Sequence, residues 1–213
     1  RRGRLLGAEH PETLKTSFDL ASVYSLQKRT NEAERLTAET LAKQRRVLGI
    51  EHPDTLASMN NLQTIYLSQR RYSEAEPIAK EVLQTRSRML GEEHPDTLRA
   101  IHNLAAIYGS SSRNDEAQIL YARTLKSRRL VLGETHPDTL FTQLRLAAVY
   151  RSQRRFEEAE GLALGAYRGF RDTLGDKHDR TVLAIEELVT LYDSWGKAKT
   201  ALDWRARLTS EGD

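Results

Sequence analysis

The stretch from Leu90 to Leu98, LGEEHPDTL, decides how the chain folds. Similar stretches begin at Leu6, Leu48, Leu132 and Leu174, so five copies follow one another at a constant spacing of 42 residues. A fixed spacing of this size is the signature of a repeat protein, in which each repeat packs only against its neighbours. We therefore interpret the motif first as a structural element of the repeat, and only then as a possible catalytic or metal-binding site.

The same spacing extends well beyond the motif. Each repeat carries a leucine, a tyrosine and an alanine at matching places, and we expect these three columns to be buried in every repeat. They are Leu20, Leu62, Leu104, Leu146 and Leu188; Tyr24, Tyr66, Tyr108, Tyr150 and Tyr192; and Ala33, Ala75, Ala117, Ala159 and Ala201.

Each repeat reads as a pair of helices, here called helix A and helix B. In the second repeat, Leu56, Met59 and Leu62 recur at the spacing of one helical face. His52 is placed at the N-cap and Pro53 at the first helical position, where a missing N–H costs nothing. The motif is therefore the start of helix A, which we expect over residues 53–68.

Helix B of the second repeat is predicted over residues 73–90, with Ser73 as its N-cap and Gly91 as a left-handed residue after its end. The sequence thus predicts an all-α protein, a single solenoid of five helix-turn-helix repeats. The expected boundaries are residues 1–9 for the end of a preceding repeat, then 10–49, 52–91, 94–133, 136–175 and 178–209, the last including a C-terminal cap.

The composition excludes several classes of protein. No apolar run approaches the roughly 18 residues that a membrane-spanning helix needs. The absence of cysteine excludes disulfides, thiolate catalysis and cysteine-based zinc sites. A net charge of +3 permits an acidic partner without indicating nucleic acid. We expect a cytoplasmic protein that does not enter membranes.

The motif histidines do not indicate a metal site. Two histidines one repeat apart are separated by two helix layers, each about 8–10 Å thick, so their side chains cannot converge on one ion. The chain also lacks a serine–histidine–carboxylate set, a glycine-rich phosphate loop and an HExxH pattern. We therefore expect no catalytic residues, no metal, no cofactor and no enzymatic activity.

Within a repeat, Leu62, Tyr66 and Ala75 have the spacing found in tetratricopeptide repeats. The 42-residue period, the LGxEHPDTL linker and the pattern NNLxxxYxxQxRYxEAE at residues 60–76 resemble the longer kinesin-light-chain type. Such repeats occur in kinesin light chains and in C-terminal arrays of bacterial serine/threonine kinases and STAND NTPases. The ending LYDSWGKAKTALDWRARL, residues 191–208, looks like the close of such a kinase-linked array. The resemblance implies a right-handed superhelix whose helices A line a concave groove for peptides or protein segments.

A helical wheel places the groove-lining stripe opposite Leu62, at Ala57, Asn61, Thr64 and Ser68, when each residue advances by about 100°. Arginine and amide side chains at these positions in repeats 3 and 4 suit a partner with carboxylates. The predicted binding residues are Asn60, Asn61, Thr64, Arg99, His102, Asn103, Phe141 and Arg145.

Two other functions stay open. The helix B faces or the terminal repeats could pair two chains, giving a homo-oligomer that regulates an attached effector. Basic turns at 28–29, 70–71 and 154–155 could meet phosphates, although their spacing follows the repeat and no aromatic residues interleave with them. We favour a protein-interaction scaffold that is the C-terminal recognition region of a larger signalling protein. Self-association is the alternative, and nucleic-acid binding is the least favoured of the three.

Overall fold

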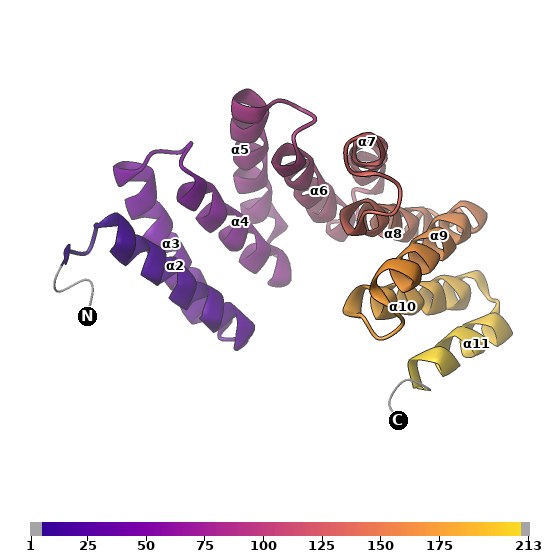
Figure 1. The fold of residues 1–213 in the computed structure, drawn as a ribbon. Coiled ribbons are helices and arrows are strands. Elements are labelled where there is room, and N and C mark those ends of the chain that lie inside the picture. Colours follow the sequence, from indigo (N-terminus) through magenta and orange to yellow (C-terminus); the bar gives the residue numbers. More distant parts are fainter. Residues whose placement is uncertain (1–5, 210–213) are drawn as a thin grey trace. The chain divides into compact units, whose positions relative to one another are not determined.

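The computed structural model describes residues 6–209, and every regular element in this range is a helix (Figure 1). The expected end of a preceding repeat at residues 1–9 therefore lies mostly outside the described residues. The all-α prediction of successive helix-turn-helix repeats is confirmed. The helices are α2 (Pro11–Leu26), α3 (Thr30–Val47), α4 (Pro53–Ser68), α5 (Tyr72–Leu90), α6 (Pro95–Ser110), α7 (Asn114–Leu132), α8 (Pro137–Ser152), α9 (Phe156–Leu174), α10 (Asp179–Trp195) and α11 (Ala198–Thr209).

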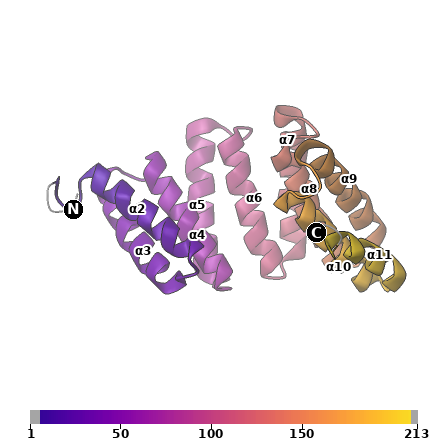
Figure 2. The same ribbon diagram turned by 60° about the horizontal axis from the view of Figure 1, so that its bottom comes forward.

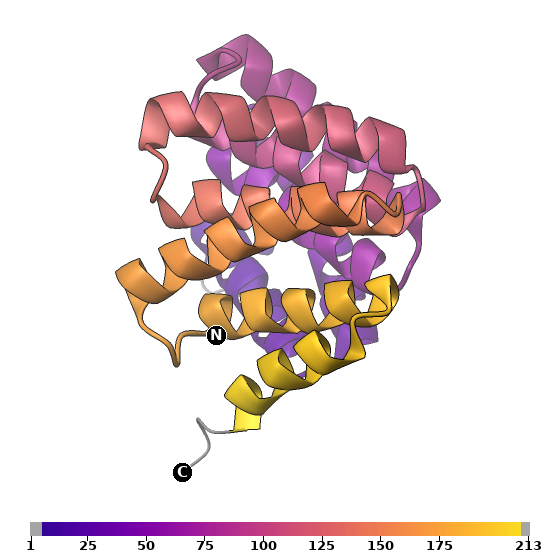
Figure 3. The same ribbon diagram turned by 90° about the vertical axis from the view of Figure 1, so that its right-hand side faces the viewer.

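The chain divides into two compact units, unit 1 at residues 1–111 and unit 2 at residues 112–213. In unit 1, α2 pairs with α3, α4 with α5, and α6 packs against α5, as successive layers (Figure 2). In unit 2, α8 packs against both α7 and α9, and α10 packs against α9 and α11 (Figure 3). Even-numbered helices are helices A and odd-numbered helices are helices B.

The motif histidines start helices A, as the sequence predicts. Each histidine is the N-cap, and its Nδ1 accepts a hydrogen bond from the backbone N–H two residues later, at 3.1 to 3.3 Å. This bond satisfies one of the N–H groups that a helix start leaves without a partner. Proline follows the histidine in α2, α4, α6 and α8, and Asp179 takes its place in α10.

The ends of helices B differ in detail from the sequence prediction. Gly91 has a φ of 86° and a ψ of 165°, so its φ is positive as expected but its ψ lies outside the left-handed helical region. This extended conformation at positive φ is essentially restricted to glycine because it has no Cβ. Gly133 and Gly175 repeat it, which explains the glycine column.

The turn between helices A and B is held by an arginine rather than by a capping serine. The prediction of Ser73 as N-cap is wrong, since α5 begins at Tyr72 with Arg71 at its N-cap. The Arg71 guanidinium lies 4.3 Å from the centre of the Tyr66 ring and pairs with Glu74 at 2.6 Å. These contacts fix the turn without a side-chain cap.

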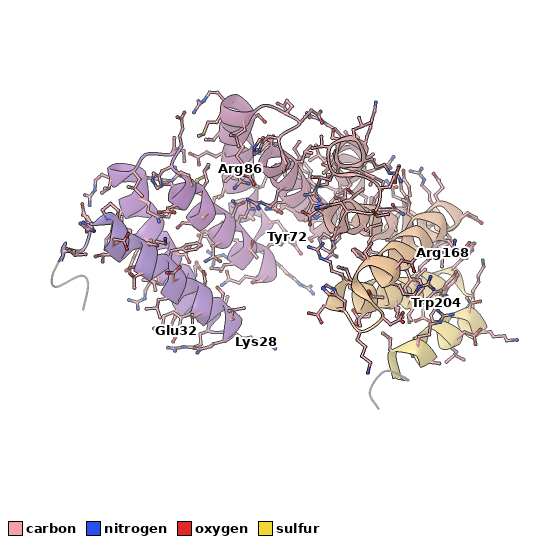
Figure 4. The ribbon with its side chains drawn as sticks, viewed as in Figure 1. Lys28, Glu32, Tyr72, Arg86, Arg168 and Trp204 are labelled. Carbon is pink, nitrogen blue, oxygen red and sulfur yellow. The ribbon has the colours of Figure 1, made fainter. Side chains whose placement is uncertain are left out.

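Repeats 1 and 4 build this turn in the same way. Arg29 lies over Tyr24 at 4.3 Å and pairs with Glu32, and Arg155 lies over Tyr150 at 3.9 Å and pairs with Glu158. Figure 4 shows Lys28 and Glu32 at the turn that joins α2 to α3. The residue before each arginine has a positive φ, at Lys28, Arg70 and Arg154, and Gly196 fills the matching place in repeat 5.

Burial confirms the alanine column but only part of the other two. All five alanines are fully buried. The leucines are buried in repeats 2 to 5, whereas Leu20 is 44% exposed, so the prediction of burial in every repeat is wrong there. Tyr108 and Tyr192 are buried, and the other three tyrosines are half-buried, each beneath its turn arginine.

Candidate functional site

A hollow of about 490 Å³ lies among α4, α5 and α6 of unit 1. Three of the predicted binding residues line it, namely Asn60 on α4 and Arg99 and Asn103 on α6. Arg86 of α5 joins them (Figure 4), and the apolar part of the wall includes Leu56. The hollow therefore combines arginine and amide groups with an apolar surface.

The amide groups connect the two helices A of this hollow. Asn103 Nδ2 donates to Asn60 Oδ1 at 3.4 Å, and Gln63 Nε2 donates to the same oxygen at 3.0 Å. Asn60 Nδ2 donates to the backbone oxygen of Leu56 at 2.8 Å. The Asn60 side chain is thus fixed in position, and it holds the Asn103 side chain at the surface of the hollow.

Two arginines, Arg86 and Arg99, line the hollow together with two carboxylates, Glu51 and Asp96. Arg86 is only 5% exposed, and its Nη1 donates to the backbone oxygen of Asp96 at 3.1 Å. Burial, and then the neighbouring charge of Arg99, lower the pKa of the Arg86 guanidinium. Arg99 is more exposed and pairs with the Asp96 carboxylate at 2.8 Å. Two neighbouring cations, one of them mostly desolvated, favour an anionic group beside them, and Asp96 supplies one such group to Arg99.

Sequence reasoning missed Arg86 because it searched only helices A. The sequence did carry a signal, since Arg86 and Arg128 occupy one column on the buried side of helix B. Arg128 makes the matching bond, donating to the backbone oxygen of Asp138 at 2.9 Å. A repeated charge in an otherwise apolar face indicates a buried polar contact.

The other predicted residues of unit 1 do not line this hollow. Asn61 is half-buried, and its Nδ2 has no hydrogen-bond partner. Thr64 is exposed, and its hydroxyl donates to the backbone oxygen of Asn60 at 2.8 Å. His102 is 7% exposed and is not among the residues that line the hollow. Their role in binding stays a prediction.

Unit 2 places the last two predicted residues beside each other on α8. The Phe141 ring lies between two guanidinium groups, with Arg145 at 4.8 Å and Arg180 at 5.5 Å from the ring centre. Arg145 also lines a hollow of about 190 Å³, together with Glu186 and Glu187 of α10. Both hollows therefore carry both signs of charge, and the smaller one has a single arginine where the hollow of unit 1 has two.

The basic turns carry less available charge than their sequence indicates. Arg71 donates to Glu74 and Glu34, and these two contacts raise the pKa of its guanidinium. Arg29 and Arg155 have carboxylate partners of their own. Within residues 6–209 no group of histidine and acidic residues is arranged to hold a metal ion, and no helix is long and apolar enough to cross a membrane.

The tetratricopeptide repeat family matches residues 20–88, 64–129 and 96–169, which together span more than half of the chain. The chain belongs to this family. The tetratricopeptide repeat is a general protein–protein interaction module, and its members are generally scaffolds without enzymatic activity. A comparison with curated proteins finds no match.

Solved structures with the same fold include kinesin-light-chain-like proteins. The nearly identical tetratricopeptide-like repeats of a putative kinesin light chain from Podosopora anserina are 27% identical, with a TM-score of 0.74 over 94% of this chain and 95% of that one. BtubC (BKLC) from P. vanneervenii is 17% identical, with a TM-score of 0.77 over 100% and 88% of the two chains. The apo form of RapI is 14% identical, with a TM-score of 0.72 over 91% and 68%. The expected resemblance to kinesin-light-chain repeats is confirmed, and the latter two show the fold alone.

Proposed function

We propose that this tetratricopeptide repeat array binds a segment of a partner protein on the helix A face of unit 1, with an acidic group of that segment in the hollow of Arg86 and Arg99. The observation that carries the proposal is the pairing of a mostly buried guanidinium with an exposed one in a single hollow. The absence of catalysis and a cytoplasmic location belong to the same proposal.

The groups of the hollow have separate tasks in this mechanism. Arg86 is held by the Asp96 backbone oxygen, so little side-chain entropy is lost when it meets a carboxylate. Arg99 exchanges its ion pair with Asp96 for one with the ligand. Asn103 bonds the ligand backbone, and the apolar wall at Leu56 and Met89 receives a neighbouring side chain. Charge-assisted bonds of this kind give orientation as well as affinity.

The test compares two exposed arginines of unit 1. Arg99→Ala removes the hollow's accessible cation, whereas Arg35→Ala removes a control arginine that lies on α3 and pairs with Glu39 on its own helix. An array of acidic peptides, each with a copy in which glutamine and asparagine replace the acids, supplies the probes. Binding is measured by fluorescence anisotropy, and helical content by circular dichroism.

Peptides selected by the wild type should bind Arg99→Ala more than tenfold more weakly, because truncating a charged contact costs about 1.5–3 kcal/mol. Arg35→Ala should bind as the wild type does. The uncharged peptide copies should bind neither protein well. Equal affinity of Arg99→Ala and wild type for the selected peptides would contradict the proposal.

A further inference from the structure

A second and larger hollow lies in unit 2 on the side of its helices B. It has a volume of about 680 Å³ and lies between α7 and α9, with α8 beneath. Its surface is mainly apolar and includes Leu125, Leu146, Tyr150 and Leu162. Gly161 borders it and has no atom within 4 Å of the place where a Cβ would stand, so the hollow is open above α9.

An exposed leucine stands at the edge of this hollow. Leu130 of α7 is 80% exposed, although it borders the apolar lining of the hollow. The matching residues of repeats 1 and 2 are Arg46 and Arg88, which form ion pairs with Glu9 and Glu51. Repeat 3 therefore has a large apolar side chain where the earlier repeats have a paired charge.

Two charged residues of opposite sign line the hollow from its two flanking helices. Lys126 on α7 and Glu157 on α9 both line the hollow, and neither has an ion-pair partner within residues 6–209. The other charged residues of the lining are paired, Arg129 with Glu134 at 3.0 Å and Glu158 with Arg155 at 2.6 Å. The surface thus offers one free cation and one free anion on opposite helices.

We propose that this surface is a homodimer interface, in which Leu130 of each protomer enters the hollow of its partner and Lys126 faces the partner's Glu157. A two-fold interface presents the same patch on both chains, so it must be complementary to itself. This patch is self-complementary in both respects, since it has a protruding leucine with a hollow and a free cation with a free anion. A second copy of the chain is the occupant that uses all four features.

The proposed dimer is a property separate from peptide binding. It does not use the hollow of Arg86 and Arg99, which stays accessible to a peptide. Each dimer would present two such hollows, so a partner with two acidic segments would bind with increased avidity. Dimerisation would therefore double the number of peptide-binding hollows, and it requires no conformational change in either unit.

The first experiment measures the mass of the protein by sedimentation velocity from low to high micromolar concentrations. We expect a monomer–dimer equilibrium in the wild type. Leu130→Arg should raise the dimer dissociation constant at least about 100-fold, because the two-fold interface loses two buried leucine side chains. Leu202→Arg is the matched control, an exposed apolar residue on α11 outside the hollow, and should dimerise normally.

The second experiment exchanges the charges. Lys126→Glu and Glu157→Lys each place like charges in contact twice per dimer, so each should weaken the dimer about tenfold or more, and the double variant should restore it. This rescue would distinguish a second copy of the chain from any other occupant of the hollow.

A wild type that stays monomeric over the whole concentration range, or a dimer that Leu130→Arg leaves intact, would overturn the proposal. Acidic peptides should still bind monomeric Leu130→Arg, so failure of one proposal does not entail failure of the other.

Discussion

The spaces between consecutive helices B are filled differently in the two units. In unit 1, the ion pair of Arg45 on α3 with Glu81 on α5, at 2.6 Å, crosses the space above α4, and Arg45 Nη2 also approaches Met59 Sδ at 3.7 Å. In unit 2, the corresponding space between α7 and α9 above α8 is a hollow of about 680 Å³. One backbone arrangement thus carries a closed surface in one unit and an open one in the other.

The residues that match Met59, Glu81 and Arg45 also differ in unit 2. Gln143 stands where repeat 2 has Met59, and its Nε2 donates to the backbone oxygen of Leu162 at 2.9 Å. Gly165 stands where repeat 2 has Glu81, and a Cβ there would come within 2.4 Å of Gln143 Nε2. Arg129, which matches Arg45, has no carboxylate across the space and pairs with Glu134 instead. A repeat protein can therefore change its surface chemistry while it keeps its packing columns.

A column of buried positions in helices B also changes from repeat to repeat. Substitution of its last member should have the largest effect on stability. Its members are Gln44 and Arg86 in unit 1 and Arg128 and Phe170 in unit 2, all buried. Phe170 is fully buried in the core of unit 2. Phe170→Ala should lower the free energy of unfolding by about 3–5 kcal/mol, because the phenyl group leaves a cavity. Urea unfolding followed by circular dichroism measures this.

The control for that prediction is Leu202→Ala, which truncates an exposed apolar residue and should cost no more than about 0.5 kcal/mol. A loss below about 1 kcal/mol for Phe170→Ala would show that the packing around α9 can close over the missing ring.

Substitution of Gln44, the first member of the same column, should increase stability rather than lower it. Gln44 is fully buried, and neither its Nε2 nor its Oε1 has a hydrogen-bond partner. Gln44→Leu should therefore raise the free energy of unfolding by about 1–3 kcal/mol, because a buried polar group without a partner carries its desolvation penalty. Thermal unfolding is a suitable measurement, and a lower melting temperature than that of the wild type would contradict the prediction.

The ion pair that distinguishes the two spaces should have the smallest effect. A double-mutant cycle of Arg45→Ala and Glu81→Ala should give a coupling energy of about 0.2–1 kcal/mol, since both side chains are partly exposed. The coupling should fall as salt is raised. The same cycle with Arg129→Ala and Glu157→Ala should give no coupling in the monomer, because these two residues are not paired.

The candidate site shows where sequence reasoning reaches its limit. The helical wheel identified Arg99 and Asn103 because exposure on one helix follows from its period. It did not find Arg86, whose position in the hollow depends on how the end of α5 meets α6. It also gave no sign that His102 would be almost completely buried, since neighbouring helices decide that.

The sequence by itself determined the repeat, the helix pairs and the start of each helix A, because these depend on contacts within a few residues. The bond from each motif histidine to the N–H two residues later is such a contact. The tertiary structure alone decided which members of a column are buried and which surfaces are hollow. Leu20 and Leu62 share a column, yet one is 44% exposed and the other 5%, because burial depends on the helix that packs alongside.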